Sequence, residues 1–128
     1  ESGSMVGEAH TAWLIHRAAQ GASATTAEEV IHWGTAGGAQ VLGLGAVGTL
    51  QVGQAADLVL YGLDHPRFLG FHDIGVAPVV AGEPIAVRYS LVGGRLVVDD
   101  GVIPGLDLAQ LRAQAREGVQ QLLQEAMD

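Results

Sequence analysis

The sequence predicts an α/β chain in which two helices come first, a set of short β-strands follows, and a third helix comes last. Apolar residues recur at helical spacing in residues 6–20, 26–42 and 105–128. Between the last two of these segments, short apolar runs of strand length are separated by glycine and proline turns. Glycine contributes 19 of the 128 residues, about twice its usual share, which is typical of a chain with many short connections.

The composition is that of a globular, acidic chain. Hydrophobic residues make up 48% of it and charged residues 16%, which argues against a disordered tail or a coiled coil. Six basic residues against fourteen acidic ones give a net charge of −8, so there is no basic surface for nucleic acid or an anionic membrane. The sequence has no cysteine, no signal-peptide pattern and no apolar run near the roughly 18 residues that cross a bilayer. We therefore expect a cytoplasmic protein that binds neither nucleic acid nor membrane.

The first helix is expected over residues 6–20, after a loop at residues 1–5. Glu8 in the first turn and Arg17 near the end favour the helix dipole, and Gly21 is a stop signal. The apolar residues expected on one face are Ala9, Trp13 and the run from Ile15 to Ala19.

The second helix, residues 26–42, has a clear start and an unusual interior. Thr26 and Glu29 have the spacing of a capping box, in which each side chain accepts from the other residue's backbone amide. Glycines inside the helix each cost about 1 kcal/mol against alanine, so they predict the close approach of another backbone. These glycines are Gly34, Gly37 and Gly38, and the expected inner face is Val30, Trp33, Gly37 and Val41.

Residues 46–104 are predicted to hold the strands. The apolar run Ala56–Tyr61 has the length of one strand. Residues 62–84 contain three prolines and four glycines and are expected to be irregular. An irregular stretch of this length is usually functional or packed on a partner.

A hairpin is predicted after the irregular stretch. Val87–Val92 and Arg95–Val98 flank Gly93-Gly94, a two-residue loop that accepts positive φ at both positions. Asp100-Gly101 is then expected to turn the chain towards Val102-Ile103.

The last helix lies within residues 105–128. Asp107 is the expected cap, and Gln110 occupies the third position of a capping box. Glutamine and glutamate fill the other face, which predicts contact with solvent. The apolar stripe consists of Leu108, Leu111, Ala115, Val119, Leu122 and Ala126.

Two stretches resemble the C-terminal signature of the metal-dependent amidohydrolase superfamily. The first stretch has two parts: in Ala36–Leu44 a helix ends in a Leu-Gly turn, and Val47–Val59 contains Gly-x-Leu-x-x-Gly-x-x-Ala-Asp-Leu. The second stretch, Val87–Gly101, resembles the closing hairpin of that family. The resemblance implies an α/β fragment that holds the last helices of a (β/α)8 barrel, part of the small β-sandwich beside it and a C-terminal helix. Residues 1–45 would then belong to the barrel, 46–104 to the β-sandwich and 105–128 to the C-terminal helix.

A narrower resemblance concerns the chemistry of the parent enzyme. Met5–Ala9 is similar to the stretch that follows the last metal-binding loop in deaminases of this superfamily, although His10 stands where they have arginine. Leu63–Asp73 resembles the Arg-Phe-x-Gly-x-His-Asp segment of 8-oxoguanine deaminases and hydroxyatrazine-type ethylaminohydrolases, but Asp73–Pro78 departs from their continuation and leaves the substrate open. The resemblance implies removal of an amino or alkylamino group from a purine, pyrimidine or triazine ring. It also implies a zinc or iron ion, held by several histidines and one aspartate, that activates a bound water.

The histidines do not supply that metal site. No two of them form the His-x-His pair of the family, and the resemblance places the catalytic aspartate before residue 1. His10 and His16 lie roughly 240° apart round a helix and cannot chelate one ion, and His32 beside Trp33 is expected to be structural. We therefore expect no catalytic, cofactor-binding or metal-binding residue in this chain.

The irregular stretch has the best remaining cluster of possible metal ligands. His65 and His72 lie there with Asp64 and Asp73, but their spacing is not that of a regular metal site. A loop that packs on the barrel or on a neighbouring subunit is the favoured interpretation.

Three other features suggest chemistry but are expected to be structural. Asp57 is expected to accept backbone amides at the start of a strand, and Glu8 to interact with a helix dipole. Gly43-Leu44-Gly45 follows a helix rather than a strand, so it is not a dinucleotide-binding fingerprint.

A (β/α)8 barrel needs about 250 residues, so this chain is expected to be inactive on its own. Its expected partners are the missing N-terminal barrel portion of the same protein, which would hold the metal, and further copies in a homo-oligomer. The parent enzyme would also bind a small heterocyclic substrate. Two alternatives stay open: a non-catalytic binding or assembly module, and a fragment of another amidohydrolase branch, such as an imidazolonepropionase or a dihydroorotase.

Overall fold

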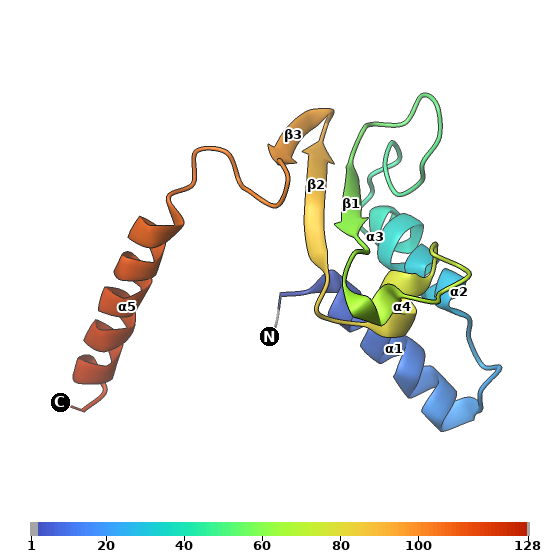
Figure 1. The fold of residues 1–128 in the computed structure, drawn as a ribbon, viewed down its shortest axis with the longest axis horizontal. Coiled ribbons are helices and arrows are strands. Elements are labelled where there is room, and N and C mark those ends of the chain that lie inside the picture. The colour runs from blue at the N-terminus through green and yellow to red at the C-terminus, as the bar shows by residue number, and fades with distance from the viewer. Residues whose placement is uncertain (1–2, 128) are drawn as a thin grey trace.

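The computed structural model describes residues 3–127. Helices α1 to α4 gather on one side of a small antiparallel sheet, and α5 stands apart from both (Figure 1). Within the described residues, no helix is both long and apolar enough to cross a membrane.

Helix α1 (Met5–Gln20) confirms the first predicted helix and begins one residue earlier. The Ser4 side chain caps it by accepting from the Gly7 amide at 3.1 Å, and the Gly21 amide donates to the Arg17 carbonyl at its end. Val6 is its buried residue, whereas Ile15 is exposed. The predicted apolar stripe is therefore only partly covered by the described part of this chain: Ala9 and Trp13 are partly buried, and Ile15 is exposed.

The second predicted helix forms as three successive segments. They are α2 (Ala27–His32), a π-helical turn η1 (Trp33–Gly37) and α3 (Gly38–Val41). The capping box is present, with Thr26 Oγ1 accepting from the Glu29 amide at 3.2 Å and Glu29 Oε2 from the Thr26 amide at 2.8 Å.

The predicted inner face of this helix is wrong in part. Val30 and Ala39 are buried, but Trp33 is partly exposed and Val41 is almost fully exposed. A π-turn takes more residues per turn than an α-helix. The residues of α3, which follow the π-turn, are therefore rotated about the helix axis relative to the positions that α-helical spacing predicts.

The close backbone approach predicted for this helix occurs, but at different residues. Gly48, with φ of +96°, lies so near the helix that a Cβ there would stand 2.9 Å from Ala36 Cα and 2.9 Å from Ala39 Cβ. No other described segment lies within 4 Å of the Cβ positions of the helix glycines, Gly34, Gly37 and Gly38. The glycine that the approach requires is therefore on the approaching loop.

The sheet contains β1 (Leu58–Gly62), β2 (Ala86–Val92) and β3 (Arg95–Val98), in the order β1-β2-β3 with antiparallel neighbours. The hairpin through Gly93-Gly94 is confirmed, with positive φ at both glycines. The predicted turn at Asp100-Gly101 is also present, closed by a bridge between Asp99 and Val102. Residues 3–127 form this one sheet, so the β-sandwich stays a prediction.

The prediction of an irregular segment at residues 62–84 is wrong in part. A 3-10 turn η2 (Pro66–Phe68) and a short helix α4 (Ala77–Ala81) form inside it, each with proline in its first turn. Helix α4 packs against α1 and α2. Phe68, Ala77 and Val79 are buried there, so the segment packs on the helices of its own chain.

Helix α5 (Leu108–Glu125) confirms the last predicted helix. Asp107 Oδ1 accepts from the amides of Ala109 and Gln110 at 2.9 and 3.0 Å, as the predicted cap requires. Every described residue of the helix is exposed, including the whole apolar stripe, and it lies away from the other elements (Figure 1).

Gly48→Ala should lower the free energy of unfolding by about 3 kcal/mol, because it adds backbone strain at positive φ and overpacks the helix. Gly53→Ala is the matched control, since Gly53 has φ of +94° and open space around its Cβ position. It should cost about 1–2 kcal/mol from strain alone. Urea unfolding of both variants measures the difference, and equal losses would contradict the close approach.

The capping box should make the stability of the chain depend on pH. The backbone hydrogen bond from Thr26, followed by that from the Thr25 hydroxyl, lowers the pKa of Glu29 below its ordinary value of 4.5. A lowered folded pKa gives stability that is present above pH 4.5 and is lost as pH falls through the folded pKa. Wild type should therefore lose more of its unfolding free energy on acidification than Glu29→Gln. Glu28→Gln, one position earlier, should behave like wild type.

Candidate functional site

The segment between β1 and β2 is held in shape by one guanidinium group. Arg67 Nη1 donates to the carbonyls of Ala81 and Gly82 at 3.3 and 3.2 Å, and also to that of Glu83. These carbonyls belong to the last residue of α4 and the two residues after it, where free acceptors and the negative end of the helix dipole favour a cation. Arg67 thus fixes the C-terminal end of α4 to η2.

His10 holds the same helix from the side of α1. Its Nδ1 donates to the Val79 carbonyl at 2.7 Å, and its ring lies where a Cβ on Gly82 would come within 3.1 Å. His10 therefore links α1 to α4. Sequence reasoning missed both this link and the Arg67 clamp, because neither partner backbone is near in sequence.

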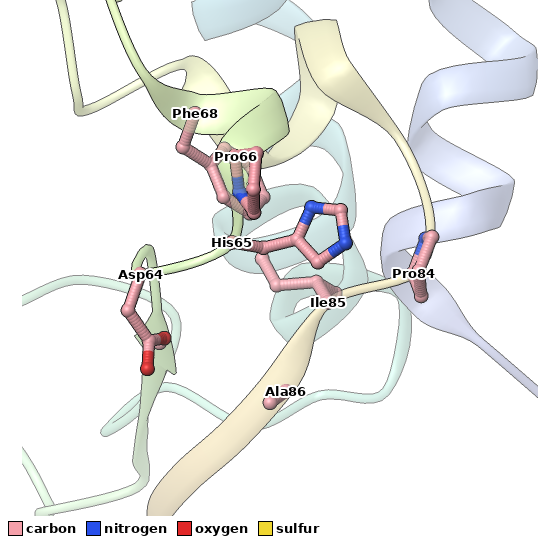
Figure 2. A pocket seen from close by; sticks show the side chains of 8 residues that line it. Asp64, His65, Pro66, Phe68, Pro84, Ile85 and Ala86 are labelled. Atoms are coloured by element: carbon pink, nitrogen blue, oxygen red, sulfur yellow. The ribbon is translucent and has the colours of Figure 1, made fainter.

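A hollow of about 460 Å³ lies beside this clamp, between the end of β1 and the start of β2. His65 Nδ1 accepts from the Arg67 amide at 3.3 Å, and its ring points towards Pro84 and Ile85, away from the Asp64 carboxylate (Figure 2). The hollow is lined by Gly62, Asp64, His65, Pro66, Phe68, Pro84, Ile85 and Ala86.

The acidic groups near this hollow have protein partners. Asp64 lies 3.9 Å from Arg88, which also pairs with Asp100 at 2.6 Å. Burial, with a smaller contribution from Glu83, raises the pKa of Tyr61 above its ordinary value, so this half-buried phenol stays neutral at physiological pH. Asp64 is thus engaged in an ion pair rather than turned towards His65.

The remaining histidines are separate from this hollow. The His16 ring packs edge-on against Trp33 with centroids 5.3 Å apart, and His32 and His72 are exposed. Among residues 3–127 no group of three His, Cys, Asp or Glu side chains could hold a metal ion. The described residues therefore do not fit the zinc or iron that the sequence resemblance implies for the parent enzyme.

Asp57 has the structural role that the sequence predicts. Its Oδ1 accepts from the Gly93 amide, and the Gly94 amide donates to the neighbouring Ala56 carbonyl at 3.0 Å. The carboxylate thus ties the β2–β3 turn to the start of β1. Glu8 is exposed in the first turn of α1, as expected for a helix-dipole role.

A second, larger hollow separates the second helix from β1, and we call it the helix–β1 groove. Its volume is about 810 Å³. Its lining comes from the second helix along its length, the loop that follows it, the start of β1 and the first residue of α1. The lining residues are Met5, Glu28, Ile31, His32, Gly34, Thr35, Gly38, Ala39, Leu42, Leu44, Val47, Gly48, Thr49, Leu50, Asp57, Leu58 and Val59.

Comparison with known proteins identifies the family of this chain. The sequence profile of the amidohydrolase family matches residues 1–97. The chain belongs to the amidohydrolase family. The resemblance found in the sequence is therefore confirmed.

Curated relatives of this amidohydrolase chain include two deaminases. It is 42% identical to an isoxanthopterin deaminase from an unknown prokaryotic organism, over 99% of this chain and 30% of the relative. It is 38% identical to an 8-oxoguanine deaminase from Pseudomonas aeruginosa, over 96% of this chain and 27% of the relative. The chain thus spans less than a third of the length of either protein.

Solved structures agree with this assignment. An amidohydrolase from an environmental sample of the Sargasso Sea, 44% identical, superposes with a TM-score of 0.88 over 97% of this chain and 28% of its own. An adenosine deaminase from Xanthomonas campestris with bound zinc, 26% identical, reaches 0.82 over 94% of this chain and 28% of its own. An atrazine chlorohydrolase from Arthrobacter aurescens complexed with zinc is 25% identical. It superposes with a TM-score of 0.76 over 88% of this chain and 25% of its own.

Arg67→Met should lower the free energy of unfolding of this amidohydrolase chain by about 2–3 kcal/mol, because it leaves the carbonyls after α4 without their charged donor. Arg67→Lys should recover only part of the loss, since one ammonium cannot reproduce the planar guanidinium. The control is Arg95→Met on an exposed position of β3, which should change stability little. Thermal unfolding measures all three, and equal stability of the Arg67 and Arg95 variants would rule out the clamp.

Proposed function

We propose that this chain is the C-terminal part of a metal-dependent hydrolase that removes an amino or alkylamino group from a purine, pyrimidine or triazine ring. One observation carries the proposal. Over nearly its whole length, the chain is 42% identical to an isoxanthopterin deaminase and 38% identical to an 8-oxoguanine deaminase. The triazine hydrolases match at 25–27% identity, so deamination is favoured over chlorohydrolysis.

In this proposal the metal is held by the part of the enzyme outside this chain. Two solved relatives contain zinc, whereas the described residues of this chain offer no group suited to a metal ion. The charged side chains of the candidate site bind the chain's own backbone instead: Arg67 holds the end of α4, and Asp57 holds the β2–β3 turn. The proposed contribution of the chain is therefore structural. Assembly as a homo-oligomer and location in the cytoplasm remain predictions.

The proposal can be tested by joining this chain to the remaining portion of the isoxanthopterin deaminase, in place of the segment that it matches. We expect the fused protein to retain zinc, measured by elemental mass spectrometry, and to release ammonia from isoxanthopterin or 8-oxoguanine. The 128-residue chain alone should release none, even with added zinc.

Two results would count against this function. Ammonia release by the chain alone would contradict the assignment of the catalytic groups to the rest of the enzyme. A folded, zinc-containing fusion that deaminates neither compound would contradict the proposed substrate class. Calorimetric titration of the chain alone with each compound tests the alternative of a non-catalytic binding module, which requires binding without hydrolysis.

A further inference from the structure

The hollow beside the Arg67 clamp, between the end of β1 and the start of β2, has the form of a small-molecule site. Its volume of about 460 Å³ falls within the range of roughly 300–1,000 Å³ that is usual for ligand pockets. Its walls are mostly apolar: Phe68 is buried, and Pro66, Pro84 and Ile85 line the hollow with it. Walls of this kind favour an apolar or aromatic ring over a fully polar ligand.

Contacts within the chain fix the walls of this hollow. On one side, Gly62 and Ala86 are paired in the antiparallel ladder between β1 and β2. On the other side, Arg67 donates to the three backbone carbonyls that precede Pro84. The hollow is therefore formed before a ligand arrives, and binding does not have to order the segment.

His65 presents a hydrogen-bond donor in the hollow. Its Nδ1 accepts from the Arg67 amide at 3.3 Å, so the neutral ring carries its proton on Nε2. The ring points towards Pro84 and Ile85, which are walls of the hollow (Figure 2). The Nε2–H can therefore donate to an acceptor atom of a ligand.

Asp64 supplies a negative charge at the β1 end of the hollow. A Cβ on Gly62 would come within 3.0 Å of Asp64 Oδ1, so the carboxylate lies against the end of β1. Arg88 neutralises this charge only in part, because its guanidinium lies 3.9 Å from Asp64 and 2.6 Å from Asp100. Two carboxylates share one cation, and one negative charge remains. A ligand with a protonated amino group is attracted to this end.

The charges around the hollow disfavour an anionic ligand. Burial, and to a smaller extent the charge of Glu83, raises the pKa of Tyr61, which precedes the lining residue Gly62. Arg67 Nη1 is occupied by backbone carbonyls. An anion would therefore meet carboxylates without gaining a cation of its own.

The two polar groups of the hollow point in different directions, since the His65 ring is turned away from the Asp64 carboxylate (Figure 2). A ligand that meets both needs a donor at one end and an acceptor at the other. We propose that this hollow binds a small aromatic amine, with its ring against the apolar walls, its amino group facing Asp64 and an acceptor atom facing the Nε2–H of His65. This proposal does not rest on the proposed function.

The test is a titration of the 128-residue chain with three related ligands, followed by two-dimensional NMR of the backbone amides. Tyramine has a ring, an ammonium group and a phenol oxygen, phenethylamine lacks the oxygen, and 4-hydroxyphenylacetate has a carboxylate in place of the ammonium group. For tyramine we expect a dissociation constant on the order of 1 mM, as is usual for a ligand of its size. Phenethylamine should bind more weakly and 4-hydroxyphenylacetate not at all. The shifts should centre on the amides of Gly62, His65 and Ala86.

Two variants of the lining separate the two polar contacts. Asp64→Asn should weaken tyramine binding about fivefold, because the hydrogen bond from the ammonium group loses its charged acceptor. The matched control is Asp73→Asn, which removes the same charge at an exposed residue outside the lining and can keep the hydrogen bond to the Gly75 amide. It should bind tyramine like wild type. His65→Asn can still accept from the Arg67 amide but has no ring donor, so it should bind tyramine and phenethylamine equally.

Three results would overturn the ligand site. They are tyramine shifts that do not saturate, binding of 4-hydroxyphenylacetate as tight as that of tyramine, and equal losses in the Asp64 and Asp73 variants.

A second measurement asks whether the hollow stays open in the longer enzyme. Tyramine is titrated by calorimetry into the covalent fusion proposed above, with and without Asp64→Asn. The fivefold difference between the two should persist there. Equal binding by the two fusions would mean that another segment fills the hollow, and it would overturn the ligand site independently of any ammonia release.

Discussion

The approach of Gly48 to the second helix is the contact on which the arrangement of helices and strands depends. The loop that follows the helix returns across Ala36 and Ala39 before the chain enters β1. A Cβ at Gly48 would stand only 2.9 Å from atoms of both residues, so a side chain does not fit there. Positive φ at Gly48 turns the loop back towards the sheet. The helix–β1 groove exists because this single contact brings the two elements together while leaving the rest of their facing surfaces open.

Three polar side chains of this chain complete its own backbone. Arg67 satisfies carbonyls after α4, Asp57 accepts from the β2–β3 turn, and His10 joins α1 to α4 through the Val79 carbonyl. Each contact joins residues 14 or more positions apart in the sequence. In a chain with few charges, a side chain fixed in this way is not free to act on a substrate. The functional value of these groups therefore lies in the shape that they hold.

Local signals predicted the features that depend on neighbours in sequence. The capping box at Thr26, the Gly93-Gly94 turn and the Asp107 cap are decided within a few residues, and each is present. The inner face of the second helix was predicted with α-helical spacing throughout. The π-turn at Trp33–Gly37 changes that spacing, so the prediction fails for residues in and after the turn. Helix α4 was missed because five residues with a proline carry almost no periodic signal, and its stability comes from packing on α1 and α2.

Two exposed apolar surfaces among residues 3–127 differ in how selectively they could bind a partner. The groove combines large side chains, a track of small residues and two carboxylates, so only a complementary shape and charge can fill it. The exposed stripe on α5 offers one apolar face, which adds buried area but little selectivity. The family profile covers the groove and stops at residue 97, before α5 begins, whereas the isoxanthopterin deaminase matches 99% of the chain. The groove thus lies within the part of the chain that the family profile matches, and α5 lies after that part.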